Sequence, residues 1–159
     1  MSPNGAADTG PTQAPSATGW AADPDALADF LAEPNLCRIA TVDRDGAAHV
    51  VPAWFWWDGR RFWIGAQADD HKVANVRRTR RASVEVDSDL RRKRGILARG
   101  SARVIDGAAG QREYVRISAE QLRRYQPDKP PLETAERMAT KGTPVVVEVT
   151  PATIVSWGR

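Results

Sequence analysis

Apolar and polar positions alternate with a strand period of two in some segments and with a helical period of about 3.6 in others. The changes of period divide the chain into short strands and helices. Asp23 followed by Pro24 is a typical helix start. Apolar residues at helical spacing follow over residues 27–31, and Pro34 ends the pattern. We therefore expect a short amphipathic helix before the first strand.

Three apolar segments then follow one another with only short turns between them. Residues 36–43, 48–57 and 60–68 are rich in β-branched and aromatic side chains. The Asp58-Gly59 dipeptide favours a tight hairpin turn, because Gly accepts the positive φ that such a turn requires. The pattern predicts a meander of three antiparallel strands.

Residues 69–157 also alternate between segments of helical period and segments of strand period. Gly100 stands inside one of the predicted strands, where it indicates a β-bulge or the close approach of another backbone or a ligand. The predicted elements are a helix over 69–81 capped by Asp70, strands over 82–87 and 95–106, helices over 108–126 and 131–142, and one or two strands over 144–157.

The segment VPAWFWWDGRRFW, residues 51–63, is apolar on both faces of its strands and holds six of the eleven aromatic residues. Pro52 removes a hydrogen-bond donor, so we expect the 48–57 strand to lie at an edge or to be interrupted. Strand alternation then places Ala53, Phe55 and Trp57 on one face and Pro52, Trp54 and Trp56 on the other. The second face needs a cover, which is a helix of the same chain, a second subunit or a flat cofactor.

Residues 1–22 form a predicted disordered tail, because the first nineteen carry no Lys, no Arg and no large side chain beyond Met1. Residues 23–159 have the size of one domain. Six or seven short strands with a few helices predict a mainly β, α+β domain built as a small antiparallel barrel with peripheral helices.

Cysteine and hydropathy patterns exclude several classes of protein. Cys37 is the one cysteine, so it forms no internal disulfide, and no spacing of Cys and His indicates a metal site. No segment has eighteen consecutive apolar residues, and the N-terminus lacks a signal-peptide pattern. We expect a cytoplasmic protein with no metal and no membrane span.

Positive charge is concentrated in one stretch, although the whole chain carries a net charge of only +3. Residues 72–94 contain nine Lys and Arg against three acidic residues, a local net charge of +6. An anionic partner is one interpretation and a solvated surface is the other. Nucleic acid is the less favoured anion, because no DNA-binding motif is present and no aromatic residues stand between the basic ones.

Three motifs in order give the chain a recognisable pattern: TVDRDGAAHVVPAWFWWDG, the helix start HKVANVRR, and the strand RGSARV. Their order resembles the pyridoxamine 5'-phosphate oxidase-like split β-barrel proteins of the FMN-binding type, and among them the flavin and deazaflavin oxidoreductases. The resemblance is strong over residues 25–106 and weaker over 144–157. It implies a six- to seven-stranded antiparallel split barrel over 23–159 that binds a flavin or deazaflavin.

The resemblance also implies where a cofactor binds. The strand from His49 to Trp54 would line the ring, the end of the next strand would border it, and the pair His71-Lys72 would hold the cofactor phosphate. A helix N-terminus favours an anion, which agrees with that placement. The implied cofactor contacts are His49, Val51, Pro52, Trp54, Ala66, Gln67, His71, Lys72, Asn75 and Trp157.

Two departures from the pattern bear on the choice of cofactor and substrate. His49 and Trp54 stand where the oxidases proper have Arg and Lys, and no equivalent of their substrate-phosphate arginines is evident. Oxidation of pyridoxamine phosphate is therefore disfavoured. The arginines from Arg77 to Arg81 would suit the poly-γ-glutamate tail of the deazaflavin coenzyme F420, which favours F420 over FMN.

The resemblance predicts an oxidoreductase in which the reduced cofactor delivers hydride to a small organic substrate, at the interface of a homodimer. Two alternatives stay open: a split barrel that binds flavin or haem without turnover, and a nucleic-acid-binding protein that uses residues 72–94. The sequence names no catalytic acid or base.

Overall fold

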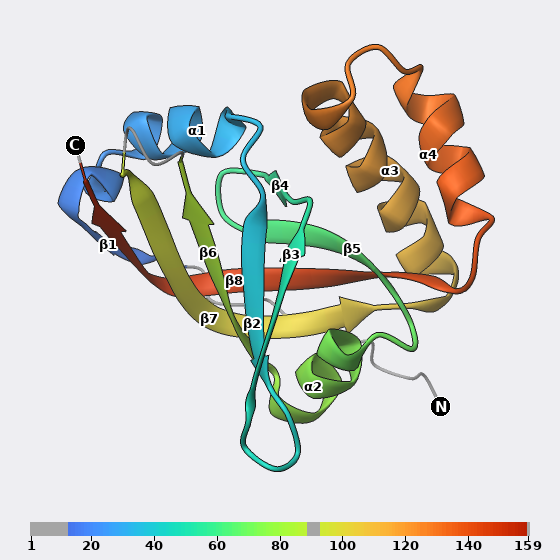
Figure 1. Cartoon of the computed structure of the whole chain (residues 1–159), viewed down its shortest axis with the longest axis horizontal. Helices are drawn as coiled ribbons and strands as arrows, with labels where there is room; N and C mark the ends of the chain where they lie inside the picture. The colour runs from blue at the N-terminus through green and yellow to red at the C-terminus, as the bar shows by residue number, and fades with distance from the viewer. Residues whose placement is uncertain (1–12, 89–92, 159) are drawn as a thin grey trace, which may run out of the picture.

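Eight strands form one curled sheet in the computed structural model, which describes residues 13–88 and 93–158 (Figure 1). Seven strands run in the order β3-β2-β6-β7-β8-β5-β4 with antiparallel pairing, and β1 adds in parallel to β8. The strands are β1 (Ser16–Thr18), β2 (Cys37–Val42), β3 (Ala48–Ala53), β4 (Trp56–Trp57), β5 (Phe62–Gln67), β6 (Arg81–Asp87), β7 (Gly95–Ile105) and β8 (Pro144–Trp157). The predicted antiparallel split barrel is confirmed.

Helices lie around this sheet, and Figure 1 shows α1 and α2 at opposite ends of it. They are the 3₁₀-helix η1 (Gly19–Ala22), α1 (Pro24–Ala32), α2 (His71–Thr79), α3 (Gly107–Tyr125) and α4 (Pro131–Ala139). Helix α2 is shorter than predicted, because Arg80 takes a left-handed conformation (φ 58°) and ends it. No helix among residues 13–88 and 93–158 is long and apolar enough to cross a membrane.

The aromatic segment divides between the two faces as the alternation predicts. Phe55 is fully buried and packs with Trp57 and Ala53 in the main core. Trp56 and Trp54 lie on the other side, against α3 and α4. A helical pair of the same chain therefore covers this part of the second face. The strand break falls at residues 54–55, and β3 is an edge strand, so Pro52 costs no ladder hydrogen bond.

Arg124 of α3 fastens the helical pair to the break between β3 and β4. Its guanidinium donates hydrogen bonds to the carbonyl oxygens of Phe55 and Leu31 and to the Tyr125 hydroxyl. The guanidinium also stacks over the Phe55 ring, 4.4 Å from its centroid. The carbonyl that the strand break leaves without a ladder partner is satisfied in this way.

The predicted disordered tail is wrong for its last residues, and residues 1–12 lie outside the described part of the chain. Strand β1 pairs with Thr153–Val155 of β8, beyond the part of β8 that pairs with β5. Trp20 packs edge-on against Phe30 at 5.0 Å and donates from Nε1 to the Trp157 carbonyl oxygen. Pairing with an open strand edge orders a segment whose composition favours disorder.

Gly100 allows a close approach of two backbones in the sheet. The register of β7 and β8 shifts here, since Arg99 pairs with Thr153 and Gly100 with Pro151. A Cβ at Gly100 would lie 1.9 Å from the Thr150 carbonyl oxygen. The bulge and the close approach inferred from this glycine are both present.

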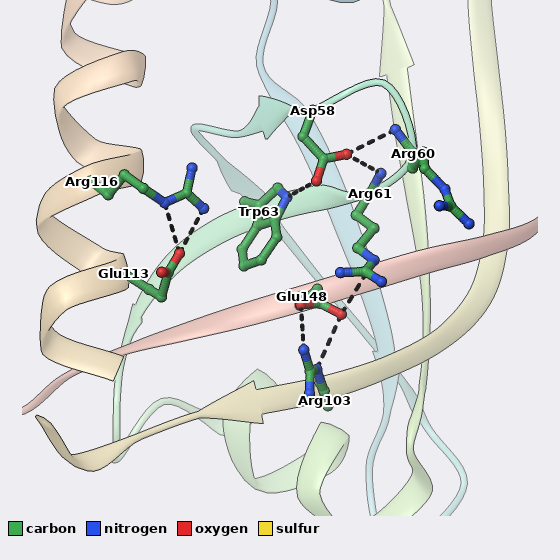
Figure 2. A network of polar contacts seen from close by, with 8 residues as sticks. All are labelled: Asp58, Arg60, Arg61, Trp63, Arg103, Glu113, Arg116 and Glu148. Atoms are coloured by element: carbon green, nitrogen blue, oxygen red, sulfur yellow. Dashed lines mark hydrogen bonds and ion pairs between the residues drawn. The ribbon is translucent and has the colours of Figure 1, made fainter. Parts of the chain in front are cut away.

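A buried carboxylate of β8 lies between two arginines of neighbouring segments (Figure 2). Glu148 of β8 is 4% exposed and accepts two hydrogen bonds from Arg103, at 3.1 and 2.9 Å. Arg61 lies 3.7 Å away on the other side, in the turn that precedes β5. The turn itself is held by Asp58, which accepts hydrogen bonds from two backbone N–H groups and the Trp63 indole.

Candidate functional site

The N-terminus of α2 is the centre of the candidate site. Asp70 occupies the N-cap position, but its carboxylate accepts hydrogen bonds from the Gln67 backbone N–H at 3.0 Å and Lys72 Nζ at 2.5 Å. No side chain of the described residues caps the helix. The Val73 and Ala74 N–H groups bond to the Asp70 carbonyl oxygen, so the N–H groups of His71 and Lys72 are the ones that an anion can use.

The Asp70 carboxylate keeps its negative charge at neutral pH. Burial on its own raises the pKa of Asp70, but the hydrogen bonds from Lys72 and Gln67 and the charges of Lys72 and His49 lower this pKa below its ordinary value. The sequence leaves open whether Asp70 opposes an anion here. In the structure Lys72 neutralises it, so the two side chains together add little net charge.

Both histidines of the chain meet at this helix start. His49 points from β3 toward α2, and its ring centroid lies 5.6 Å from that of His71, the first residue of α2. His49 is half-buried and His71 is exposed. The resemblance places His71 at the cofactor phosphate and His49 on the strand that lines the ring, and the fold brings the two side chains together.

Asn75 lies one turn further along α2 and faces inward. It is 5% exposed and donates hydrogen bonds from Nδ2 to Thr41 at 3.1 Å and to Asp43 at 2.7 Å. Its Oδ1 accepts a hydrogen bond from Arg78 at 3.2 Å. Asn75 thus ties α2 to the β2–β3 hairpin, and it reaches the candidate site through Asp43.

Sequence reasoning did not single out Asp43 as a site residue. It stands in the TVDRDG segment, which was interpreted as a strand end and a turn, and its backbone makes the turn hydrogen bonds with Ala47 and Gly46. The carboxylate side chain reaches the histidine pair only because the hairpin folds over the start of α2. No spacing in the sequence signals that contact.

Gln67, at the end of β5, carries the clearest unsatisfied polar atom near α2. Its Oε1 is buried and accepts no hydrogen bond from any described residue. The amide lies against Gly142, where an added Cβ would come within 2.4 Å of Oε1. A buried acceptor without a partner is costly, so this oxygen is a candidate to receive an N–H group of a ligand.

The other predicted contacts are spread over different parts of the fold. Val51 and Ala66 pack on the main core, whereas Pro52 is exposed on the outer face of β3. Trp54 stacks on Tyr125, with ring centroids 4.9 Å apart and planes at 13°. Adjacent residues of a strand face opposite sides, so the Val51 and Pro52 side chains point away from each other.

Trp157 lies at the far end of β8 from the start of α2. Gln67 pairs with Pro144, the first residue of β8, and Trp157 is the last. Its ring packs over Gly95, and its exposed fraction is 41%. Within one chain, Trp157 is not brought to His49 and His71.

The basic stretch is divided by the end of α2. Arg77 pairs with Asp106 at 3.2 Å, and Arg78 donates to the Val42 carbonyl oxygen and to Asn75. Beyond the helix, arginines line an open groove of about 730 Å³ on the sheet. They are Arg80, Arg81 and Arg99. Residues 89–92 of the predicted basic loop lie outside the described residues.

A family model described as pyridoxamine 5'-phosphate oxidase matches residues 23–158. The chain belongs to the pyridoxamine 5'-phosphate oxidase family. The resemblance inferred from the three sequence motifs is therefore confirmed at the level of the family. No curated protein matches the chain.

Solved structures similar to this pyridoxamine 5'-phosphate oxidase family member carry several kinds of name. A conserved hypothetical protein, Rv2991, from Mycobacterium tuberculosis is 23% identical with a TM-score of 0.72, and the match covers 94% of this chain and 90% of that one. An F420 reductase is 22% identical with a TM-score of 0.59, covering 79% and 93%.

The haem storage protein HutZ from Vibrio cholerae is 15% identical with a TM-score of 0.62, covering 81% of this chain and 89% of that one. At such identities, the three structures establish the shared fold. Proteins named for reduction and for haem storage both have this fold, so the activity has to be argued from the site.

Proposed function

We propose that the protein is an oxidoreductase that binds reduced coenzyme F420, or alternatively FMN, and transfers hydride to a small organic substrate. The observation that carries this proposal is the start of α2. It has no side-chain cap, and Lys72, His71 and His49 gather beside it. This arrangement suits the phosphate that both cofactors contain.

The donor set at α2 fits a phosphate in number and charge. The free N–H groups at the helix start and the two imidazoles can donate hydrogen bonds, and Lys72 adds a full charge that it shares with Asp70. A phosphate oxygen would share the Lys72 ammonium group with Asp70 and accept a charge-assisted hydrogen bond from it. Gln67 Oε1 supplies an acceptor for an N–H group of the ring system.

Coenzyme F420 is favoured over FMN because of the arginines past α2. Its tail carries several carboxylates beyond the phosphate, whereas FMN ends at the phosphate. Arg77 and Arg78 are engaged within the chain, so the helix itself offers little to such a tail. The groove lined by Arg80, Arg81 and Arg99 offers cationic donors with open solvent access instead.

The bound cofactor would supply the hydride, and the protein would bind, orient and shield it. In this proposal His49, His71 and Lys72 hold the phosphate end and Gln67 orients the ring end. The cofactor explains why no nucleophile with its own general base is required among these residues. No acid or base of this chain is assigned a proton-transfer role.

We also propose a homodimer with the site at its interface. The outer face of β2 and β3 carries Val42 and Val50, which are 47% and 55% exposed, beside exposed Pro52. Exposed apolar side chains next to one another on a sheet favour association.

Titration of the protein with coenzyme F420 and with FMN, followed by quenching of tryptophan fluorescence, tests the proposal. We expect saturable quenching at micromolar concentrations, with the tighter binding for F420. If neither cofactor binds at those concentrations, the proposal is wrong. Analytical ultracentrifugation of the same samples tests the homodimer, which predicts about twice the 17.4 kDa chain mass.

A binding protein without turnover is the second candidate, and the likeness to a haem storage protein favours keeping it. It predicts tight haem or flavin binding together with reduced cofactor that persists when electron acceptors are added. An oxidoreductase predicts that at least one small acceptor oxidises the bound reduced cofactor. Anaerobic single-turnover mixing with a panel of acceptors separates the two.

A further inference from the structure

Three potential metal ligands meet where the β2–β3 hairpin touches α2. They are Asp43 from the hairpin, His49 from β3 and His71 from the first turn of α2. One ligand atom from each residue lies within 4.8 Å of the others. These two histidines are the only ones in the chain, and the fold brings both to one point.

We propose that Asp43, His49 and His71 form a binding site for a divalent transition-metal ion, with Zn²⁺ as the representative cation. Two imidazole nitrogens and one carboxylate oxygen are a ligand set that suits Zn²⁺ and other first-row divalent ions. Three protein ligands leave at least one coordination position for water or another oxygen ligand. His49 and His71 are also the imidazoles assigned above to the cofactor phosphate, so with the ion bound a phosphate oxygen would occupy the open position instead of contacting them directly.

The distances require only a modest adjustment of the side chains. Ligand atoms bound tetrahedrally at about 2.0–2.1 Å from zinc lie roughly 3.3 Å apart. The three atoms here lie within 4.8 Å of one another, and His71 is exposed on the first turn of a helix. Rotation of the exposed His71 imidazole can supply the remaining movement without a change in the backbone.

Asn75 gives the site the outer support that metal ligands in proteins have. Its buried amide donates to Asp43 at 2.7 Å and is itself fixed by Thr41 and Arg78. A hydrogen bond of this kind orients a ligating carboxylate. The contact leaves the rest of the Asp43 carboxylate available to face the histidines.

The cationic side chains near the site are bound to other groups of the protein, which reduces their electrostatic repulsion of a metal ion. Lys72 is paired with Asp70 at 2.5 Å. Arg78 donates to the Val42 carbonyl oxygen and to Asn75. The Lys72–Asp70 pair therefore adds little net charge beside the proposed ion.

Calorimetric titration of the full chain with zinc chloride tests the site. We expect one ion per chain with a dissociation constant in the micromolar range or below. Asp43→Asn, His49→Ala and His71→Ala should each raise that constant at least tenfold. Asp45→Asn, an isosteric change at an exposed carboxylate of the same hairpin, and Cys37→Ala, which removes the one thiol, should leave it within twofold.

Nitrogen-15 NMR of the imidazoles provides a second measurement that does not depend on the stability of any variant. With two histidines, both ring spin systems should change together and saturate at one equivalent of Zn²⁺. Binding weaker than millimolar, unchanged imidazole signals, or affinity that survives His71→Ala would overturn the proposal. Loss of binding in Cys37→Ala with a retained melting temperature would also overturn it.

Discussion

The Lys72 ammonium group lies 2.5 Å from an Asp70 carboxylate oxygen at the start of α2. The lysine that the sequence assigns to a cofactor phosphate therefore already has an anionic partner. An incoming phosphate would share Lys72 with Asp70, and the two negative groups would repel each other. The affinity of the site should depend on both residues, in opposite directions.

Lys72→Ala should weaken binding of F420 or FMN about tenfold or more, because a charge-assisted hydrogen bond contributes ~1.5–3 kcal/mol. Asp70→Asn should strengthen binding roughly fivefold, since removing one nearby like charge at a partly solvated site is worth about 1 kcal/mol. Fluorescence titration of each variant measures both changes. Lys129→Ala, at a surface lysine paired with Gln126, is the matched control and should bind as the unmodified protein does. Equal affinities for all three variants would show that the phosphate binds elsewhere.

Glu148→Gln should lower the free energy of unfolding by about 1–3 kcal/mol. The substitution leaves the charged partners of a 4% exposed carboxylate without their counter-charge. Glu120→Gln breaks a pair with Arg123 in which both side chains are exposed, and should cost less than about 1 kcal/mol. Urea denaturation of both variants measures the difference. Equal losses would mean that burial adds nothing to the Glu148 interactions.

Gly100→Ala should destabilise the fold by about 3 kcal/mol, the upper end of the usual cost of overpacking. The obstacle is the Thr150 backbone carbonyl at 1.9 Å from the new Cβ, and a backbone group in the middle of a sheet cannot rotate away. Ser101→Ala, at the next and exposed residue, should change the stability by less than about 0.5 kcal/mol. Thermal unfolding of the two variants gives the comparison, and a tolerated Gly100→Ala would contradict the register at the bulge.

Cys37 should not react with thiol reagents in the folded protein. Burial raises the pKa of its thiol to about 12, although the Arg124 charge partly opposes this shift. In the unfolded chain the thiol ionises near the ordinary value of 9.0. Between pH 9.0 and about 12 the thiol is protonated in the folded state and ionised in the unfolded state. The free energy of unfolding therefore falls as the pH rises through this range. Disulfide-exchange labelling with and without denaturant checks the protection, and rapid labelling of the folded protein would contradict it.

Several parts of the fold follow directly from local sequence signals. The Asp58-Gly59 turn, the position of Gly100 and the alternation of Ala53, Phe55 and Trp57 each depend on neighbours close in the chain. Backbone conformation and face alternation are local properties, so they can be inferred from the sequence. The limits of α2 were less predictable, because the left-handed Arg80 has no glycine to signal it.

The order of residues 16–22 was missed for a related reason. Composition measures how much apolar surface a segment offers, and this one offers little besides Trp20. The segment is ordered by the open edge of β8 and by the Trp20–Phe30 contact. Both partners are distant in sequence, and neither is visible in the segment itself.

The site shows the same division between local and distant information. The resemblance to the family marked His49, His71 and Lys72, and the fold brings these three together at one helix start. The resemblance did not reveal that Lys72 is paired with Asp70 or that Asp43 lies beside the two histidines. Side-chain partners depend on rotamers and on packing across elements, which no spacing rule encodes.

The sequence by itself determined the family, the split barrel and a helix that begins near residue 70, because motif order and local periodicity carry that information. Tertiary structure alone decided which side chains remain available there. Packing turned Asn75 inward, placed Trp54 on Tyr125 and left Trp157 at the far end of β8. These outcomes follow from contacts between segments far apart in the chain, and such contacts form only when the whole sheet closes.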